Sequence, residues 1–416
     1  MSSKGYLVTG KKEECLGCSA CVQVCPHSAL SMKEDSEGFR YPALNPEACV
    51  DCGLCHKVCP QEKDIDKHSE IQTSFGGYAL DEKIRCQSTS GGAFSCIVDV
   101  WCDENCVIFG AVAKGLDVHH EYVLDKAMAD RFRKSKYSQS KIGNTYREAY
   151  QFLKDGKKVL FSGTPCQIAG LRKFLEIRKT DINRMLTVEV VCEGVPSPYY
   201  VRKLDDYLTE KYGAGIKDLD YRYKDGRYDV PSNGRRKGRW DFQVMRIRLK
   251  NSKTLKKDRW FNPFWSIWLN HLMNRPSCYS CPYATRQRVA DITLGDLWGV
   301  HIYCPELYGD NGGSSLIVAN TKTGQEVVRK AETLMYGHSL DMDDVVRFQG
   351  PMRKSIPENP HRCEFMSELV DPQTTYTQIT RKWAVRPSFK LLFSKYIWGN
   401  HQKVRLWKIK RYLSKR

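Results

Sequence analysis

The stretch KKVLFSGTPCQIAGLRKFLEIRKTDINRMLTVEVVC, residues 157–192, reads in order as a strand, a turn, a helix and a second strand. Apolar runs fill 157–163 and 186–192, and between them the apolar positions of 167–179 recur at helical spacing. This succession predicts a βαβ unit and a parallel or mixed sheet. Another compact apolar run, 106–113, predicts a further strand. We therefore expect a mixed α/β domain in the middle of the chain.

Cysteines lie at the ends of both strands, since Cys166 follows the first and Cys192 is the last residue of the second. If the strands are parallel neighbours, both thiols arrive at the sheet edge where such sheets bind ligands. Cys278 and Cys281 come later with the C-x2-C spacing of half a cluster site. These four thiolates are enough for one [4Fe–4S] cluster, and four unrelated buried cysteines are the alternative. A nucleophilic Cys166 is a weaker interpretation, because no partnered histidine is evident.

Two cysteine runs nearer the N-terminus share one pattern. CLGCSACVQVCP (15–26) and CVDCGLCHKVCP (49–60) both fit C-x2-C-x2-C-x3-C-P, the spacing of bacterial two-cluster ferredoxins. In such runs the fourth cysteine ligates the cluster of the other run. The first [4Fe–4S] cluster therefore takes Cys15, Cys18, Cys21 and Cys59, and the second takes Cys49, Cys52, Cys55 and Cys25. A zinc module is the alternative, but zinc sites close with four ligands and do not need the doubled pattern.

The composition predicts a cytoplasmic protein. The 416 residues are 41% hydrophobic and 27% charged, which is ordinary for a soluble globular chain. No stretch of about 18 residues is mostly apolar and uncharged, and the first residues lack the apolar centre of a signal peptide. Because a reducing compartment keeps thiols free, the 18 cysteines indicate metal or cluster ligation rather than disulfides.

Two polar loops are candidates for holding a cofactor. STSGG (88–92) stands directly before a helical run, where hydroxyls and bare backbone N–H groups suit a phosphate. A plain helix N-cap is the alternative. SKYSQS (135–140) offers a mix of side chains suited to a flavin's ring edge and pyrophosphate, or is simply a polar loop.

Taken together, the motifs resemble the coenzyme F420 hydrogenase/dehydrogenase beta-subunit family over about residues 75–320. They are STSGG (88–92), SKYSQS (135–140), VLFSGTPCQIAGL (159–171), VVCEGVPSP (190–198), CYSCPYATRQRVADITLGDLWG (278–299) and GSSLIVANT (313–321). Members are FAD- and iron–sulfur-containing oxidoreductase subunits, and an N-terminal ferredoxin module is a common fusion among them.

The resemblance implies positions for the cofactors. Cys166, Cys192, Cys278 and Cys281 would surround an inner [4Fe–4S] cluster near the flavin. The residues expected at the FAD are Ser88, Thr89, Ser90, Gly91, Gly92, Ser135, Lys136, Tyr137, Gln139, Ser140, Gly163 and Thr164. For shaping the site or moving protons we name Lys136, Asp291, Asp296 and Arg286; for the last three, turns and salt bridges are an equal alternative.

These observations predict four parts. A two-cluster ferredoxin module occupies 1–66, the flavin loops 75–155, the inner cluster and substrate site 156–350, and a basic helical tail 351–416. Electrons would pass between an external ferredoxin or other redox protein, the clusters, FAD and an organic substrate, because a flavin couples one-electron to two-electron chemistry. The alternatives are an electron-transfer subunit that feeds a separate catalytic partner, and a non-enzymatic iron–sulfur protein.

Positive charge is concentrated at the C-terminal end. Residues 381–416 contain 12 Lys and Arg and no acidic residue, out of a net charge of +18. Basic residues interleaved with aromatic ones favour peripheral contact with an anionic inner membrane face, which would suit a membrane-linked pathway such as surface-polysaccharide synthesis. A nucleic-acid partner lacks a supporting motif, and a helix docked on the body is the alternative. A hairpin over 221–260 with basic residues at its tip is interpreted as a solvated loop, with an acidic-substrate grip as the alternative.

Overall fold

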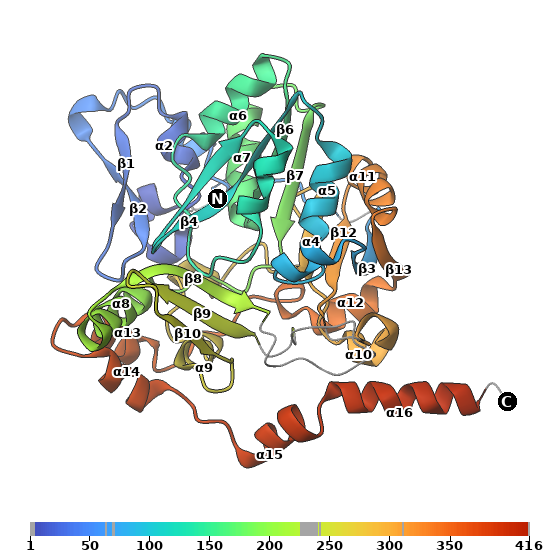
Figure 1. Ribbon diagram of the computed structural model, residues 1–416. Coiled ribbons are helices and arrows are strands. Elements are labelled where there is room, and N and C mark those ends of the chain that lie inside the picture. The colour runs from blue at the N-terminus through green and yellow to red at the C-terminus, as the bar shows by residue number, and fades with distance from the viewer. Residues whose placement is uncertain are drawn as a thin grey trace.

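An eight-stranded mixed sheet forms the centre of the computed structural model, which describes residues 5–62, 65–68, 71–224, 240, 243–309 and 312–414 (Figure 1). The strand order is β13-β3-β12-β11-β7-β6-β4-β5, and the four strands β11, β7, β6 and β4 run parallel. The strands are β3 (Thr73–Ala79), β4 (Cys106–Lys114), β5 (Asp117–Val123), β6 (Lys158–Gly163), β7 (Met185–Val190), β11 (Ile292–Asp296), β12 (Ser315–Ala319) and β13 (Met335–Leu340).

The predicted βαβ unit is confirmed as β6, α7 (Pro165–Ile177) and β7. Its first strand is buried on both faces, as expected for a parallel strand covered by helices. Val159 and Phe161 pack in one core with α6 (Thr145–Lys154) and α7. Leu160 points the other way, into a core with α5 (Ala93–Trp101) and α11 (Lys322–Glu332). The alternation of side chains along one strand therefore builds both cores.

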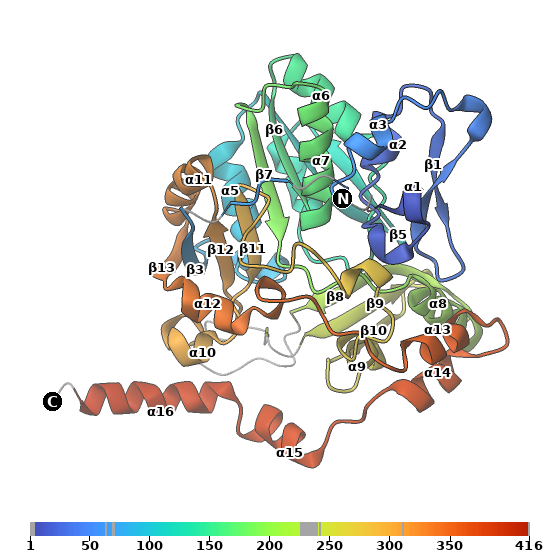
Figure 2. The ribbon, with the colours of Figure 1, turned by 180° about the vertical axis from the view of Figure 1, so that it is seen from behind.

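The N-terminal cysteine runs form a small lobe against the α6 and α7 side of the sheet (Figure 2). Its two strands make an antiparallel hairpin, and α2 packs on α7 so that Ala20 and Val24 share a core with Ile168 and Leu171. The lobe is thus packed firmly on the larger domain. Its elements are α1 (Tyr6–Thr9), α2 (Ala20–Val24), β1 (Leu30–Glu34), β2 (Arg40–Leu44) and α3 (Leu54–Lys57).

A second, antiparallel sheet lies below the first, with the order β10-β9-β8. It confirms antiparallel pairing in the predicted hairpin region, whereas the basic tip falls within 225–239, outside the described residues. Phe264, Trp265 and Trp268 fill the core between this sheet and its helices. The elements are α8 (Tyr199–Tyr212), β8 (Ile216–Tyr223), β9 (Val244–Leu249), β10 (Thr254–Lys257), α9 (Pro263–Leu269), α13 (Arg362–Val370) and α14 (Tyr376–Trp383).

The chain ends in an extended arm that runs along the lower edge of the molecule (Figures 1 and 2). The arm contains α15 (Phe389–Leu392) and α16 (Asn400–Leu413). The remaining helices are α4 (Glu82–Gln87), α10 (Val300–Tyr303) and α12 (Met342–Phe348). Among the helices that the structure describes, none combines the length and the apolar character needed to span a bilayer.

Candidate functional site

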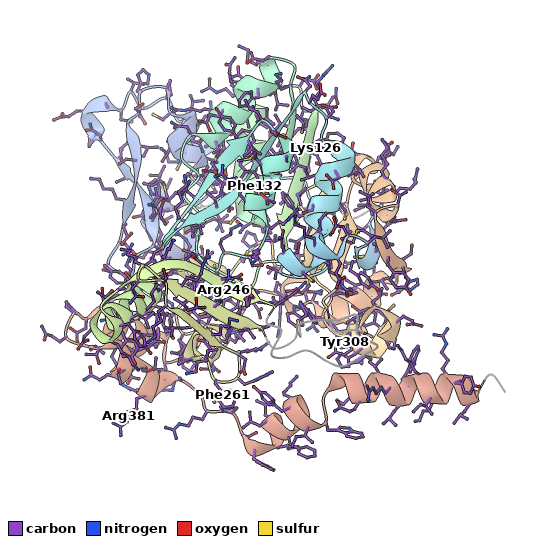
Figure 3. The ribbon with its side chains drawn as sticks, in the orientation of Figure 1. Lys126, Phe132, Arg246, Phe261, Tyr308 and Arg381 are labelled. Carbon is purple, nitrogen blue, oxygen red and sulfur yellow. The ribbon has the colours of Figure 1, made fainter. Side chains whose placement is uncertain are left out.

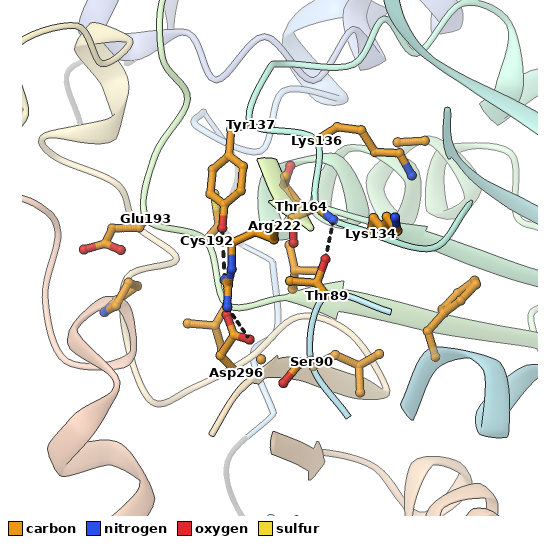
Figure 4. A pocket seen from close by; sticks show the side chains of 18 of the residues that line it. Thr89, Ser90, Lys134, Lys136, Tyr137, Thr164, Cys192, Glu193, Arg222 and Asp296 are labelled. Carbon is orange, nitrogen blue, oxygen red and sulfur yellow. Dashed lines mark hydrogen bonds and ion pairs between the residues drawn. The ribbon is translucent and has the colours of Figure 1, made fainter. Parts of the chain in front are cut away.

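A cavity of about 590 Å³ lies at the carboxyl ends of β6, β7 and β11 (Figure 4). The second sheet contributes Arg222 to its wall, and α9 contributes Trp265 and Trp268. The volume falls within the usual range for cofactor and small-molecule sites. The position at the strand ends is the one where parallel sheets bind their ligands.

The two polar loops meet in this cavity, although they are far apart in the sequence. Of the residues that the family resemblance places at a flavin, all except Gly91 line the wall. Gly91 faces the sheet instead: a Cβ there would lie 2.4 Å from the Gly77 oxygen and 2.6 Å from the Ser315 nitrogen. A side chain at this position would therefore disturb strand pairing before it reached a ligand.

The N-cap residue of α5 is Gly92, the last residue of the 88–92 loop, but none of the loop's hydroxyls caps the helix. Ser88 donates to the Ile84 carbonyl at 2.7 Å, and Ser90 donates to the Ser314 carbonyl at 2.6 Å. Thr89 accepts a 2.9 Å hydrogen bond from the Ser135 N–H (Figure 4). That last bond ties the two loops together and leaves Thr89 on the cavity wall.

A buried arginine that the sequence analysis did not identify organises the lower wall. Arg222 donates to both carboxylate oxygens of Asp296, at 2.6 and 3.2 Å, and to the Tyr137 hydroxyl at 3.3 Å (Figure 4). Trp240 also donates to Asp296, at 3.0 Å. Burial lowers the pKa of Arg222, but Asp296 and Tyr137 outweigh that effect and the pKa is raised overall. A permanent cation therefore fixes the carboxylate of Asp296 in place.

The other predicted catalytic groups are placed differently. Lys136 lines the cavity, but its ammonium donates to the Arg133 and Phe132 carbonyls at 2.7 and 3.1 Å. Asp291 is not on the cavity wall; it accepts from the Thr187 N–H and hydroxyl at 2.9 and 2.6 Å and holds the start of β11 against β7. Arg286 forms an exposed ion pair with Asp343.

Lys136 should lose its proton near neutral pH. Burial, with a smaller effect from Lys134, lowers its pKa to about 7. In the unfolded chain a lysine stays protonated to about pH 10.4, so between these values unfolding takes up a proton. The free energy of unfolding should then rise with pH by about 1.4 kcal/mol per unit relative to Lys136→Met.

The direct measurement is NMR titration of ¹³Cε-labelled lysines. One signal should have its midpoint near pH 7 and should be missing from Lys136→Arg. A Lys136 signal that titrates with the exposed lysines would contradict the effect of burial.

The four later cysteines come together in a second cavity. Cys166, Cys192, Cys278 and Cys281 all line it. Burial raises the pKa of Cys166 to about 11, and burial together with Cys278, Cys166 and Cys281 raises the pKa of Cys192. Four such thiols would ionise together only around a cation, and iron supplies that charge. The donor set therefore fits a [4Fe–4S] cluster.

The cysteines expected to ligate the first N-terminal cluster lie together. Cys15, Cys18, Cys21 and Cys59 line one cavity, with Cys55 beside them. The second set is more open: Cys49 and Cys52 are exposed, and both contribute to the raised pKa of Cys55, after burial. Cys25 accepts a hydrogen bond from the Ala29 N–H at 3.4 Å. Within the described residues, no three His, Cys, Asp or Glu side chains converge on a site for a single metal ion, whereas the thiolates of a cubane bind four separate irons.

The three cavities form a series in which the inner cysteine cavity shares lining residues with each of the other two. Leu16 lines both the N-terminal and the inner cysteine cavities. Cys192, Glu193, Gly194 and Val195 line both the inner cysteine cavity and the large cavity. Burial raises the pKa of Glu193, which places a readily protonated carboxyl at that junction. This series of cavities leads from Cys15, Cys18, Cys21 and Cys59 of the lobe, through the inner cysteines, to the large cavity.

Two regions of the chain match known protein families. Residues 14–63 match the 4Fe-4S dicluster domain, and residues 156–344 match the family described as the C terminus of the beta subunit of coenzyme F420 hydrogenase/dehydrogenase. No curated protein matches. A chain from the xenon-derivatised F420-reducing [NiFe] hydrogenase complex of Methanosarcina barkeri is 16% identical to this chain. The two structures align with a TM-score of 0.42 over 69% of this chain and 90% of that chain, which is too low to support a conclusion about fold or function. This chain thus joins a 4Fe-4S dicluster domain to the C-terminal domain of the coenzyme F420 hydrogenase/dehydrogenase beta-subunit family.

Proposed function

We propose that this iron–sulfur electron-transfer protein is a ferredoxin-coupled flavin oxidoreductase. The observation that supports this most directly is the series of adjoining cavities, two lined by cysteines and a third of about 590 Å³, within the usual range for a cofactor site. Electrons would enter at the exposed cysteines of the lobe, where an external ferredoxin can approach. They would leave through the large cavity to an organic substrate.

The residues of the large cavity fit FAD in their chemistry. Thr89 and the 135–140 loop would hold the polar parts of the cofactor, beside Lys134 and Lys136. Trp265 and Trp268 offer apolar faces to a ring system. When bound, FAD would couple one-electron transfer to hydride or two-electron chemistry. For holding and moving protons at this site we propose Asp296, Lys136 and Glu193.

The flavin site can be tested at Thr89. Thr89→Asp keeps an acceptor for the Ser135 N–H and adds a negative charge on the wall. If flavin phosphates lie there, flavin content should fall at least tenfold, because like charges repel in a poorly hydrated site. Thr89→Asn is the matched control, with the same shape and acceptor but no charge, and it should keep its flavin.

The measurement is flavin and iron per chain after anaerobic purification. Full flavin in Thr89→Asp, with iron unchanged, would place the phosphates elsewhere. Equal loss of flavin in both variants would mean that the shape of the Thr89 side chain, rather than charge, governs binding.

A second candidate function rests on the family description, which names a subunit of larger enzymes. On this hypothesis the chain transfers electrons to or from a separate catalytic protein. The purified chain would then contain its clusters and flavin and exchange electrons with a ferredoxin, yet convert no substrate until the partner is added. Turnover of an organic substrate by the chain alone would exclude it.

The C-terminal arm supports a further part of the proposal, peripheral contact with an anionic membrane. One side of α16 contacts the body through the buried Val404 and an ion pair between Arg411 and Glu306. On the opposite side, Leu406, Ile409 and Leu413 are exposed in one apolar stripe. Figure 3 shows side chains of the arm projecting away from the body as well as toward it. An apolar stripe flanked by basic residues suits a lipid interface, and hence a membrane-linked pathway such as surface-polysaccharide synthesis.

A further inference from the structure

Arg275 is a buried cation that lines the inner cysteine cavity and contacts one residue of each of the other two cavities. Its side chain is 1% exposed and lies three residues before Cys278. Its Nε donates to the Cys15 carbonyl at 2.9 Å, and its two Nη atoms donate to Gln139 Oε1 and the Arg40 carbonyl, both at 3.1 Å. All three acceptors are neutral.

The absence of a carboxylate partner distinguishes Arg275 from three other buried arginines. Arg222, Arg288 and Arg362 pair with Asp296, Glu189 and Glu37, respectively. No carboxylate lies within ion-pairing distance of Arg275 in the part of the chain that the structure describes. Burying an unpaired charge is strongly unfavourable unless an opposite charge lies near. The guanidinium also lies 4.2 Å from the centre of the Tyr41 ring, but among the described residues no carboxylate neutralises it, so the position favours a bound anion.

Thiolate-ligated clusters would be that anion. Arg275 lines the cavity of Cys166, Cys192, Cys278 and Cys281. Its positive charge acts to lower the pKa of Cys166 and Cys278, against the larger opposing effect of burial. Through Cys15 it also contacts the backbone of the N-terminal site, and through Gln139 it contacts the large cavity.

We propose that Arg275 is the fixed positive charge that raises the reduction potential of the inner cluster and so positions that cluster as an electron acceptor for the N-terminal module. The inference rests on the inner cluster of the proposed function. One electron arrives from the neighbouring N-terminal cluster, which is oxidised by one electron, and no proton is needed. Arg275 stabilises the reduced, more negative form, since net charge and hydrogen bonding around a cluster set its potential.

The test is a redox titration of the full chain followed by EPR. Arg275→Gln should move the potential of the inner cluster to a clearly more negative value, and Arg275→Lys, which keeps the charge, should restore most of it. The inner signal is identified by its absence from the double variant Cys278→Ser/Cys281→Ser. Arg147→Gln is the matched control, because Arg147 also donates to lobe carbonyls, those of Gln23 and Cys25 at 2.7 and 2.9 Å, without lining the inner cavity.

Iron content distinguishes failure of the proposed function from failure of the proposed role of Arg275. If the wild-type chain has no inner cluster, the proposed function fails and the inference fails with it. If the inner cluster is present and Arg275→Gln leaves its potential unchanged, the inference is overturned while the proposed function stands. If Arg275→Gln loses the inner cluster, the test rests on Arg275→Lys. Full iron content and a reduction potential close to that of the wild type in Arg275→Lys would support the role of charge. A reduction potential far more negative than that of the wild type would refute it.

Discussion

Anaerobically purified protein should contain about twelve iron atoms per chain, since three [4Fe–4S] clusters hold four each. The double variant Cys278→Ser/Cys281→Ser should contain about eight. The reason is geometric: these two cysteines share one cavity with Cys166 and Cys192, whereas the N-terminal cysteines line a separate one. The measurement is iron and acid-labile sulfide per chain, with EPR of the reduced protein.

The variant should also interrupt electron flow. Without the inner cluster, reduction of the flavin by reduced ferredoxin should slow by orders of magnitude, while the N-terminal clusters are still reduced. Cys96→Ser is the matched control, because Cys96 is a buried cysteine that lies in the core between α5 and α11, away from the cysteine cavities. If the wild-type protein contained only eight irons, or zinc at Cys278 and Cys281, the prediction of an inner cluster would be wrong and only the two clusters of the N-terminal lobe would remain supported.

Full-length protein should bind anionic vesicles at low salt at least tenfold more tightly than a chain that ends at residue 386. Each basic residue near an anionic surface contributes up to about 1 kcal/mol before screening. The arm exposes Phe389 (82%) and Leu413 (62%), which would add an apolar contribution that salt does not weaken. Ending the chain after residue 386 preserves α14, whose Trp383 donates to Glu368 at 2.8 Å.

A second variant isolates the apolar contribution. Replacing Leu406, Ile409 and Leu413 with serine leaves the basic residues and Val404 in place. Binding should then remain at low salt and disappear at high salt, as measured by vesicle co-sedimentation. Neutral vesicles are the control for charge. Sedimentation equilibrium and a DNA-binding assay test whether the arm instead binds a second copy of the chain or DNA. Self-association or salt-sensitive DNA binding without vesicle binding would contradict the membrane proposal.

Local patterns determined the parts of the structure whose contacts lie close together in the chain. Three ligands of each N-terminal cluster lie within one short run, so their spacing alone indicates the cofactor. The unit β6–α7–β7 could likewise be predicted, because periodicity reports which side chains are buried. Cys166 and Cys192 then followed from the rule that parallel strands end at one edge.

Only the tertiary structure decided the roles of single polar residues in the site. Arg275 reaches Cys15 across 260 positions of the chain, and Arg222 reaches Asp296 across 74. Gly91 faces the sheet although its neighbours line the cavity, and Asp291, predicted at the site, instead holds β11 against β7 through hydrogen bonds to Thr187. The physical reason is that a polar side chain's role depends on which partners burial brings to it, and sequence patterns record burial but not partners.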